Sequence, residues 1–111
     1  MRPQLNRRLT LEARVRAADG AGGYAGGWAP SGVHWAEVRA GRGRLASGEG
    51  YARAETGLRI TLRAVAQGAP SRPEAGQRFR DGTRVYKIRS VTEADPGGRY
   101  LVCFAEEELA S

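Results

Sequence analysis

The chain has 111 residues, 41% of them hydrophobic, which supports a single domain over residues 1–111 with a modest core. Its 16 glycines and 5 prolines argue against long helices and favour an all-β fold with many turns. The net charge is +6, but the 17 arginines and one lysine are spread along the chain, so charge alone does not predict a nucleic-acid-binding surface.

The N-terminal segment combines an arm with a first strand. Residues 1–7 contain one proline and two arginines and are expected to form a flexible arm. From Leu9 to Arg16, apolar and polar side chains alternate with a period of two. This alternation predicts a half-buried strand near residues 8–17.

Residues 19–32 are predicted to form a long loop. The run DGAGGYAGGWAP at its start holds five glycines and no regular pattern. A phosphate-binding loop would need a Lys-Ser or Lys-Thr pair and a following helix, and the sequence offers neither. Tyr24 and Trp28 lie in this loop and are expected to contact another subunit, because large aromatic side chains supply much contact area.

A second strand is predicted near residues 33–40, where VHWAEVR suggests Trp35 as a core residue. His34 is the only histidine, and the one cysteine, Cys103, is far away in the sequence. A metal site is therefore not expected, and His34 is interpreted as a partly exposed strand residue.

Residues 41–56 are predicted to form the second long loop, which is rich in glycine and arginine. Guanidinium groups bind acidic protein surfaces and DNA phosphates alike, so this loop is a candidate contact surface. The candidate interface residues in it are Arg42, Arg44, Tyr51 and Arg53.

The clearest amphipathic strand is predicted at residues 57–66, where leucine and isoleucine alternate with arginine and threonine. Strands at 77–80 and 83–92 are joined by Asp81-Gly82, a pair typical of tight hairpin turns. A last strand is predicted at 99–106, with apolar residues on both faces.

Six antiparallel strands with no covering helix predict a small β-barrel or a two-layer sandwich with two long loops, since closure buries one face and leaves few open edges. The expected core consists of Trp35, Leu58, Ile60, Leu62, Val85, Ile88, Val102 and Phe104.

The residues do not suggest an enzyme. We find no serine, histidine and aspartate set with plausible roles, no recognisable carboxylate pair and no metal cluster, so catalytic, metal and cofactor sites are not expected. The single cysteine excludes an internal disulfide and points to a cytoplasmic origin. The N-terminus has no apolar signal segment, and no membrane partner is expected.

The order of motifs resembles a known family. Residues 33–38, VHWAEV, are followed by Gly43-Arg44, by Ile60 to Arg63, and then by a segment running from Gly82 through Ile88 to Ser90-Val91. This arrangement, over residues 5–107, is similar to the head-tail joining (head completion or stopper) proteins of long-tailed phages and of gene transfer agents.

The resemblance implies a structural protein of the virion or gene transfer agent neck, assembled in the host cytoplasm. It implies a homo-oligomeric ring, expected to be a hexamer, beneath the portal and adaptor proteins. The ring would close the DNA-filled capsid, let double-stranded DNA pass through its channel, and dock the tail terminator or other tail proteins.

Two alternatives remain at this point. One is another connector subunit, either an adaptor, for which long helical patterns would be expected, or a tail terminator. The other is a single-strand nucleic-acid binder with an oligonucleotide-binding barrel, which would interleave aromatic and basic residues on one sheet face.

Overall fold

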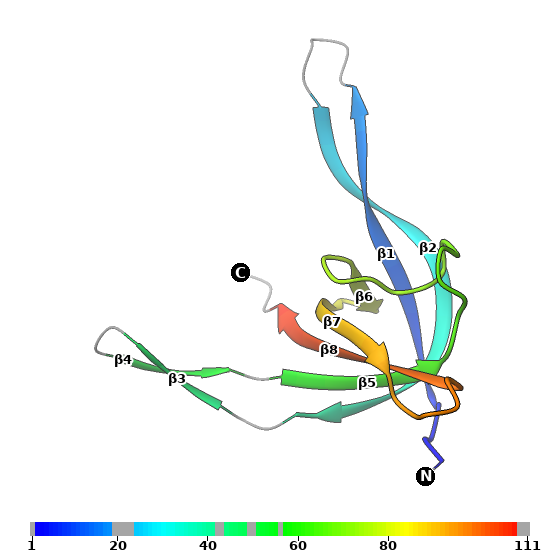
Figure 1. The fold of residues 1–111 in the computed structure, drawn as a ribbon. Helices are drawn as coiled ribbons and strands as arrows, with labels where there is room; N and C mark the ends of the chain where they lie inside the picture. The colour runs from blue at the N-terminus through cyan, green and yellow to red at the C-terminus, as the bar shows by residue number, and fades with distance from the viewer. Residues whose placement is uncertain (1, 19–23, 42–43, 49–50, 56, 109–111) are drawn as a thin grey trace.

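The computed structural model describes residues 2–18, 24–41, 44–48, 51–55 and 57–108, and within these ranges it contains strands and no helix (Figure 1). None of the described residues belongs to a helix long and apolar enough to cross a membrane. The eight strands are β1 (Arg7–Ala18), β2 (Tyr24–Ala40), β3 (Arg44–Gly48), β4 (Tyr51–Glu55), β5 (Gly57–Arg63), β6 (Arg78–Asp81), β7 (Arg84–Glu93) and β8 (Tyr100–Glu108).

Six of the strands close into an antiparallel barrel in the order β1-β2-β5-β8-β7-β6. The barrel closes where Thr10, Leu11 and Glu12 of β1 pair with Arg80, Phe79 and Arg78 of β6. The predicted all-β fold is therefore confirmed, in its barrel form. The Asp81-Gly82 turn also forms, with Gly82 at a φ of +63° joining β6 to β7.

The barrel encloses one apolar core. Its most completely buried large side chains are Phe79 and Tyr86, surrounded by leucines and isoleucines from β1, β5, β7 and β8. Among the predicted core residues, Val85 is half-buried, and those that are buried are Leu58, Ile60, Leu62, Ile88 and Val102.

The core prediction is wrong for Trp35 and Phe104, whose side chains are 55% and 42% exposed. In β2 the residue that faces inward is Ala36, which is fully buried and pairs with Leu62. In β8, Cys103 and Ala105 face inward on either side of Phe104. Successive side chains of a strand point to opposite faces, so Trp35 and Phe104 face outward where these small residues face inward.

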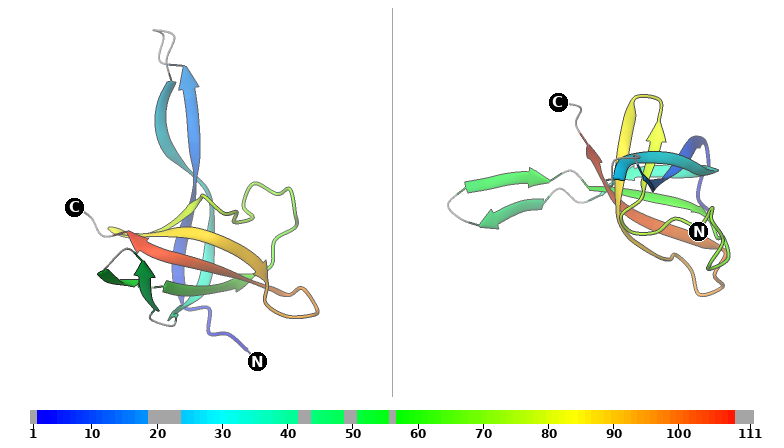
Figure 2. Two further views of the ribbon diagram at one scale, coloured as in Figure 1. Left: turned by 60° about the vertical axis from the view of Figure 1, so that its left-hand side comes forward. Right: turned by 90° about the horizontal axis from the view of Figure 1, so that it is seen from above.

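Two ribbons form in the described parts of the two predicted loops, whose residues 19–23, 42, 43, 49, 50 and 56 lie outside the described residues. β1 and β2 remain paired as far as Ala18 and Tyr24, and β3 and β4 form a separate hairpin from the Arg44–Glu55 pair to the Gly48–Tyr51 pair. Figures 1 and 2 show the ribbons leaving the barrel in different directions. The radius of gyration, 15.7 Å, accordingly exceeds the ~13 Å expected of a compact domain of this length. Glycine-rich segments show no periodicity, but backbone pairing does not require one.

A β-bulge marks where the first ribbon leaves the barrel. The register of β1 with β2 shifts between Leu11, which pairs with Gly32, and Glu12, which pairs with Pro30. Ser31 is the extra residue, and its buried hydroxyl has no partner among the described residues. Bulges of this kind bend a strand and increase its twist, which explains the change of direction in Figure 1.

Segments outside the strands are tied to the barrel by specific contacts. The backbone N–H of Gln4 donates to the Glu37 carboxylate over 2.9 Å, and the guanidinium of Arg7 bonds the Asp81 carboxylate and the Tyr86 hydroxyl. His34 Nε2 lies 2.7 Å from the carbonyl oxygen of Ser71, so this histidine holds the segment between β5 and β6.

Candidate assembly surface

Trp28 stabilises the first ribbon at its barrel end, which we call the ribbon root and define as Glu12, Arg14, Trp28, Arg78 and Arg80. Trp28 is directly opposite Arg14, whose guanidinium lies 5.2 Å from the indole centroid, while the guanidinium of Arg78 lies 4.2 Å from it. Each such cation–π contact contributes about 0.5–2 kcal/mol. Trp28 is therefore a half-buried strand residue that joins the ribbon to β6, and not the loop residue that the sequence predicted.

A carboxylate completes this root. Glu12 accepts a hydrogen bond from Arg78 Nε at 2.7 Å and one from Arg80 Nε at 3.3 Å, and only 12% of its side chain is exposed. An adjoining cavity of about 350 Å³ is lined by Arg14, Trp28, Gly76, Arg78, Lys87 and Glu108. The barrel end of the ribbon is thus held by charge and aromatic contacts and not by apolar packing.

Both ribbons present backbone edges. β6 pairs with β1 only at residues 10–12, so beyond Glu12 the outer edge of β1 has no strand partner in the described chain. β2 likewise meets β5 only from Ala36 onward, and the described β3 and β4 pair only with each other. Unpaired edges of this length readily accept a strand from another molecule.

Four of the remaining predicted interface residues belong to the ribbons. Tyr24 starts β2, Arg44 starts β3, and β4 contains Tyr51 and Arg53. Their side chains, and all of Arg42, lie outside what the structure describes.

Sequence reasoning missed a further surface on the outside of the barrel. We call it the outer aromatic face and define it as Arg8, Trp35, Arg59, Arg63 and Phe104. All five are exposed and come from β1, β2, β5 and β8. The signal that could have found it was the small residues beside the aromatics, Ala36 after Trp35 and Cys103 and Ala105 on either side of Phe104, which indicate which side of each strand faces inward.

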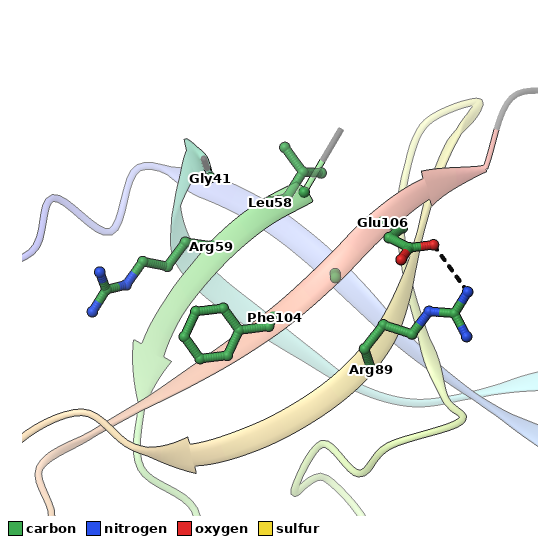
Figure 3. Close-up of a pocket in the computed structure, with 8 residues that line it drawn as sticks. Gly41, Leu58, Arg59, Arg89, Phe104 and Glu106 are labelled. Carbon is green, nitrogen blue, oxygen red and sulfur yellow. Dashed lines mark hydrogen bonds and ion pairs between the residues drawn. The ribbon is translucent and has the colours of Figure 1, made fainter. Parts of the chain in front are cut away.

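A cavity of about 470 Å³ opens on this face at the root of the β3–β4 ribbon. Figure 3 shows Phe104 standing out between Arg59 and Arg89, with Arg89 bonded to Glu106 at 2.9 Å. The Arg59 guanidinium lies 5.8 Å from the Phe104 ring centroid. Leu58 and Ala105 also line the cavity, so it combines an apolar lining with a basic edge.

Among the described residues, burial shifts the pKa of Cys103 and an ion pair shifts the pKa of Glu107. Burial raises the pKa of Cys103 to about 12, so this thiol is protonated and a poor nucleophile at neutral pH. The pKa of Glu107 is lowered, first by the hydrogen bonds from Arg84, which donates to both carboxylate oxygens at 2.8 Å. Within the described residues, no group of three His, Cys, Asp or Glu side chains is placed to hold a metal ion.

Comparison with known proteins agrees with the motif order. The model of the phage head completion protein family matches residues 1–108. Among solved structures, the chain is 49% identical to a chain of the virion of a native gene transfer agent particle, with a TM-score of 0.77, covering 98% of this chain and 100% of that one. No curated protein gives a significant match. The chain belongs to the phage head completion protein family.

Proposed function

We propose that this protein is a structural component of the neck of a phage or gene transfer agent particle, where it acts as the head-tail stopper. Copies of the chain form a ring, expected to be a hexamer, under the portal and adaptor proteins. The ring closes the DNA-filled head, gives DNA a path through its channel, and docks the tail. It performs no catalysis.

The observation that carries this proposal is the close relation to a chain of a native gene transfer agent virion, at 49% identity over almost the whole length. The match covers 98% of this chain and 100% of the other, so the similarity extends over the barrel and both ribbons. The family match over residues 1–108 supports the head side of the neck as its place.

The ribbons supply the means of assembly. A two-stranded ribbon is marginally stable by itself, and it gains hydrogen bonds and buried area when a neighbouring copy covers it. Head-to-tail contacts between ribbons and barrels close a ring when the rotation between copies divides a full turn. We propose that neighbouring copies, partner proteins or the DNA contact the predicted interface residues, which are Tyr24 and Trp28 on the first ribbon, Arg44, Tyr51 and Arg53 on the second, and Arg42.

Deletion of the gene tests the role directly. Producing cells without this protein should accumulate heads with packaged DNA and separate tails, and a plasmid copy should restore tailed particles. Electron microscopy with nuclease protection of the packaged DNA measures both. Normal tailed particles in a clean deletion would contradict the proposal, and empty heads would instead point to a role in packaging.

A further inference from the structure

We infer that the outer aromatic face is a docking surface for an acidic protein surface with an apolar projection, carried by a head or tail protein and not by another copy of this chain. The inference rests on the proposed neck function and assigns to it a binding face that is separate from the ribbons. Three observations support it: the exposed aromatics, the unpaired arginines, and the distribution of carboxylates.

The first observation is the exposure of large apolar side chains. Trp35 is 55% exposed and Phe104 42% exposed, and Val33 on the same side of β2 as Trp35 is 47% exposed. Tryptophan and phenylalanine left in water at a sheet surface are typical of interfaces, where each buries a large area with few rotatable bonds. The cavity beside Phe104 offers an apolar projection a place to insert.

The face itself is already closely packed beneath these side chains. Thr61 and Val102 face each other across β5 and β8, on the outward side, yet they are only 7% and 3% exposed. Residues on the same side of these strands, including Arg59 and Phe104, therefore shield them from water. The exposed aromatics therefore lie on a closely packed part of the sheet, so a partner would bind a preformed surface.

The second observation concerns charge. Arg8, Arg59 and Arg63 are exposed, and none of them forms an ion pair with a described residue. Arg39, at the end of β2, has only a 3.3 Å contact to Glu37. Guanidinium groups around an aromatic centre favour carboxylates on the partner, because such pairs strengthen as the apolar centre excludes water.

The third observation favours a different protein, and not a second copy of this chain, as the partner that binds the outer aromatic face. Five carboxylates of the described chain are already bound to its own arginines: Glu12, Glu37, Asp81, Glu106 and Glu107. Asp95 is occupied by the backbone N–H groups of Arg99 and Tyr100. Glu74, Glu93 and Glu108 are exposed and form no ion pair with a described residue, but a chain with a net charge of +6 carries more arginines than carboxylates, so an acidic protein would match the exposed arginines better than another copy.

DNA matches this surface less well. Phosphates would pair with the arginines, but duplex DNA would leave the Trp35 indole and the Phe104 ring exposed to water. A protein projection satisfies both parts of the surface at once. We therefore assign the face to a protein partner and use DNA as an opposing outcome of the test.

Binding to purified particle parts tests the inference. The probes are DNA-filled heads and free tails, both isolated from producing cells that lack the gene for this protein. The variants are Trp35→Ala and Arg63→Glu, and the matched control is Arg99→Glu, which makes the same charge change at an exposed turn position. Circular dichroism melting shows that each variant is folded, and cosedimentation measures bound protein.

We expect Trp35→Ala and Arg63→Glu each to weaken binding to heads or to tails by about tenfold or more, while Arg99→Glu binds like the parent. Unchanged binding of both variants, with the parent protein bound, would overturn the docking surface and leave the neck function standing. Failure of the parent protein to bind either probe would contradict the proposed function itself.

Two further measurements exclude the competing occupants. If Trp35→Ala reduced self-association, measured by analytical ultracentrifugation, and left binding to heads and tails intact, the face would be a contact between copies. If Arg63→Glu reduced binding only to a duplex DNA oligonucleotide, the face would be a DNA surface. Either result would overturn the assignment. Unchanged self-association and unchanged DNA binding, together with weakened binding to heads or tails, would support it.

Discussion

The barrel and the two ribbons use the same antiparallel pairing but are stabilised differently. In the barrel, strands close around fully buried residues such as Phe79, Tyr86 and Leu11. Along the first ribbon, none of the described side chains of residues 13–15 and 26–30 is buried. The difference indicates that the barrel folds by itself, whereas the ribbons depend on hydrogen bonds, the contacts at their roots and whatever covers them.

This division separates stability from assembly. Changes in the barrel core should unfold the protein, changes at the ribbon root should affect it less, and changes on the exposed surfaces should affect binding with little loss of stability. The predictions that follow test that ranking, from the largest expected change to the smallest.

The largest loss is expected from Phe79→Ala. The ring is fully buried where β6 closes the barrel against β1, so its removal leaves a cavity at the closing pair. We expect the free energy of unfolding to fall by about 3–5 kcal/mol. Urea denaturation followed by tryptophan fluorescence measures it, and a loss below about 1 kcal/mol would show that the core does not depend on this closure.

The ribbon root is tested by Glu12→Gln. The glutamine keeps the shape but removes the charge that pairs with both Arg78 and Arg80, and it leaves two arginines close together. We expect a loss of about 2–3 kcal/mol. Glu106→Gln provides a control, because its pair with Arg89 is exposed and should contribute less than about 1 kcal/mol. Equal losses for the two variants would contradict the stabilising role of the Glu12 ion pairs at the ribbon root.

A much smaller effect is expected from Trp35→Ala. More than half of the side chain is exposed, so its truncation should change the free energy of unfolding by less than about 1 kcal/mol. Chemical denaturation of this variant, followed by far-ultraviolet circular dichroism, gives the value. A loss of unfolding free energy near that of Phe79→Ala would show that Trp35 is a core residue, and would contradict the assignment of the outer aromatic face as an exposed surface.

The smallest effect concerns pH. The pKa of Glu107 lies below its usual 4.5 in the folded protein, because Arg84 hydrogen-bonds the carboxylate. The pair therefore stabilises the fold at pH values above 4.5, and this contribution disappears as the pH falls through the lowered pKa. Glu107→Gln should show a shallower decline of melting temperature below pH 4.5 than the parent. Parallel declines would show that the pair does not contribute.

The sequence predicted the strands whose residues face a core and failed where pairing alone makes a strand. Leu58, Ile60 and Leu62 alternate with polar residues, so both their strand and their burial were predictable. The glycine-rich start of β2 has no such alternation, and in β4 the residues that alternate with Tyr51, Arg53 and Glu55 are only alanines. Their structure follows from backbone hydrogen bonds, which leave no pattern in side-chain polarity.

The site was predictable in part. Tyr24, Arg44, Tyr51 and Arg53 lie on the two projecting segments, which the sequence predicted as loops, and their role in an interface stays a prediction. The packing of Trp28 against Arg14 and Arg78 depends on the register of β1 with β2 and β6, which the sequence does not reveal. The outward orientation of Trp35 and Phe104 depends on which of the two alternating sets of side chains in β2 and β8 faces the interior, and the set with Ala36, or with Cys103 and Ala105, faces inward.

Hydrogen exchange in the free protein and in assembled particles tests the central claim most directly, that the barrel is preformed and the ribbons are assembly elements. We predict slow exchange of the barrel amides, such as those of β5 and β8, in both states. We predict that amides of residues 13–18, 24–30 and the β3–β4 ribbon exchange quickly in the free protein and at least about tenfold more slowly in particles. Equal, slow exchange of the ribbons in both states would contradict the account, because it would show that they are stable without partners.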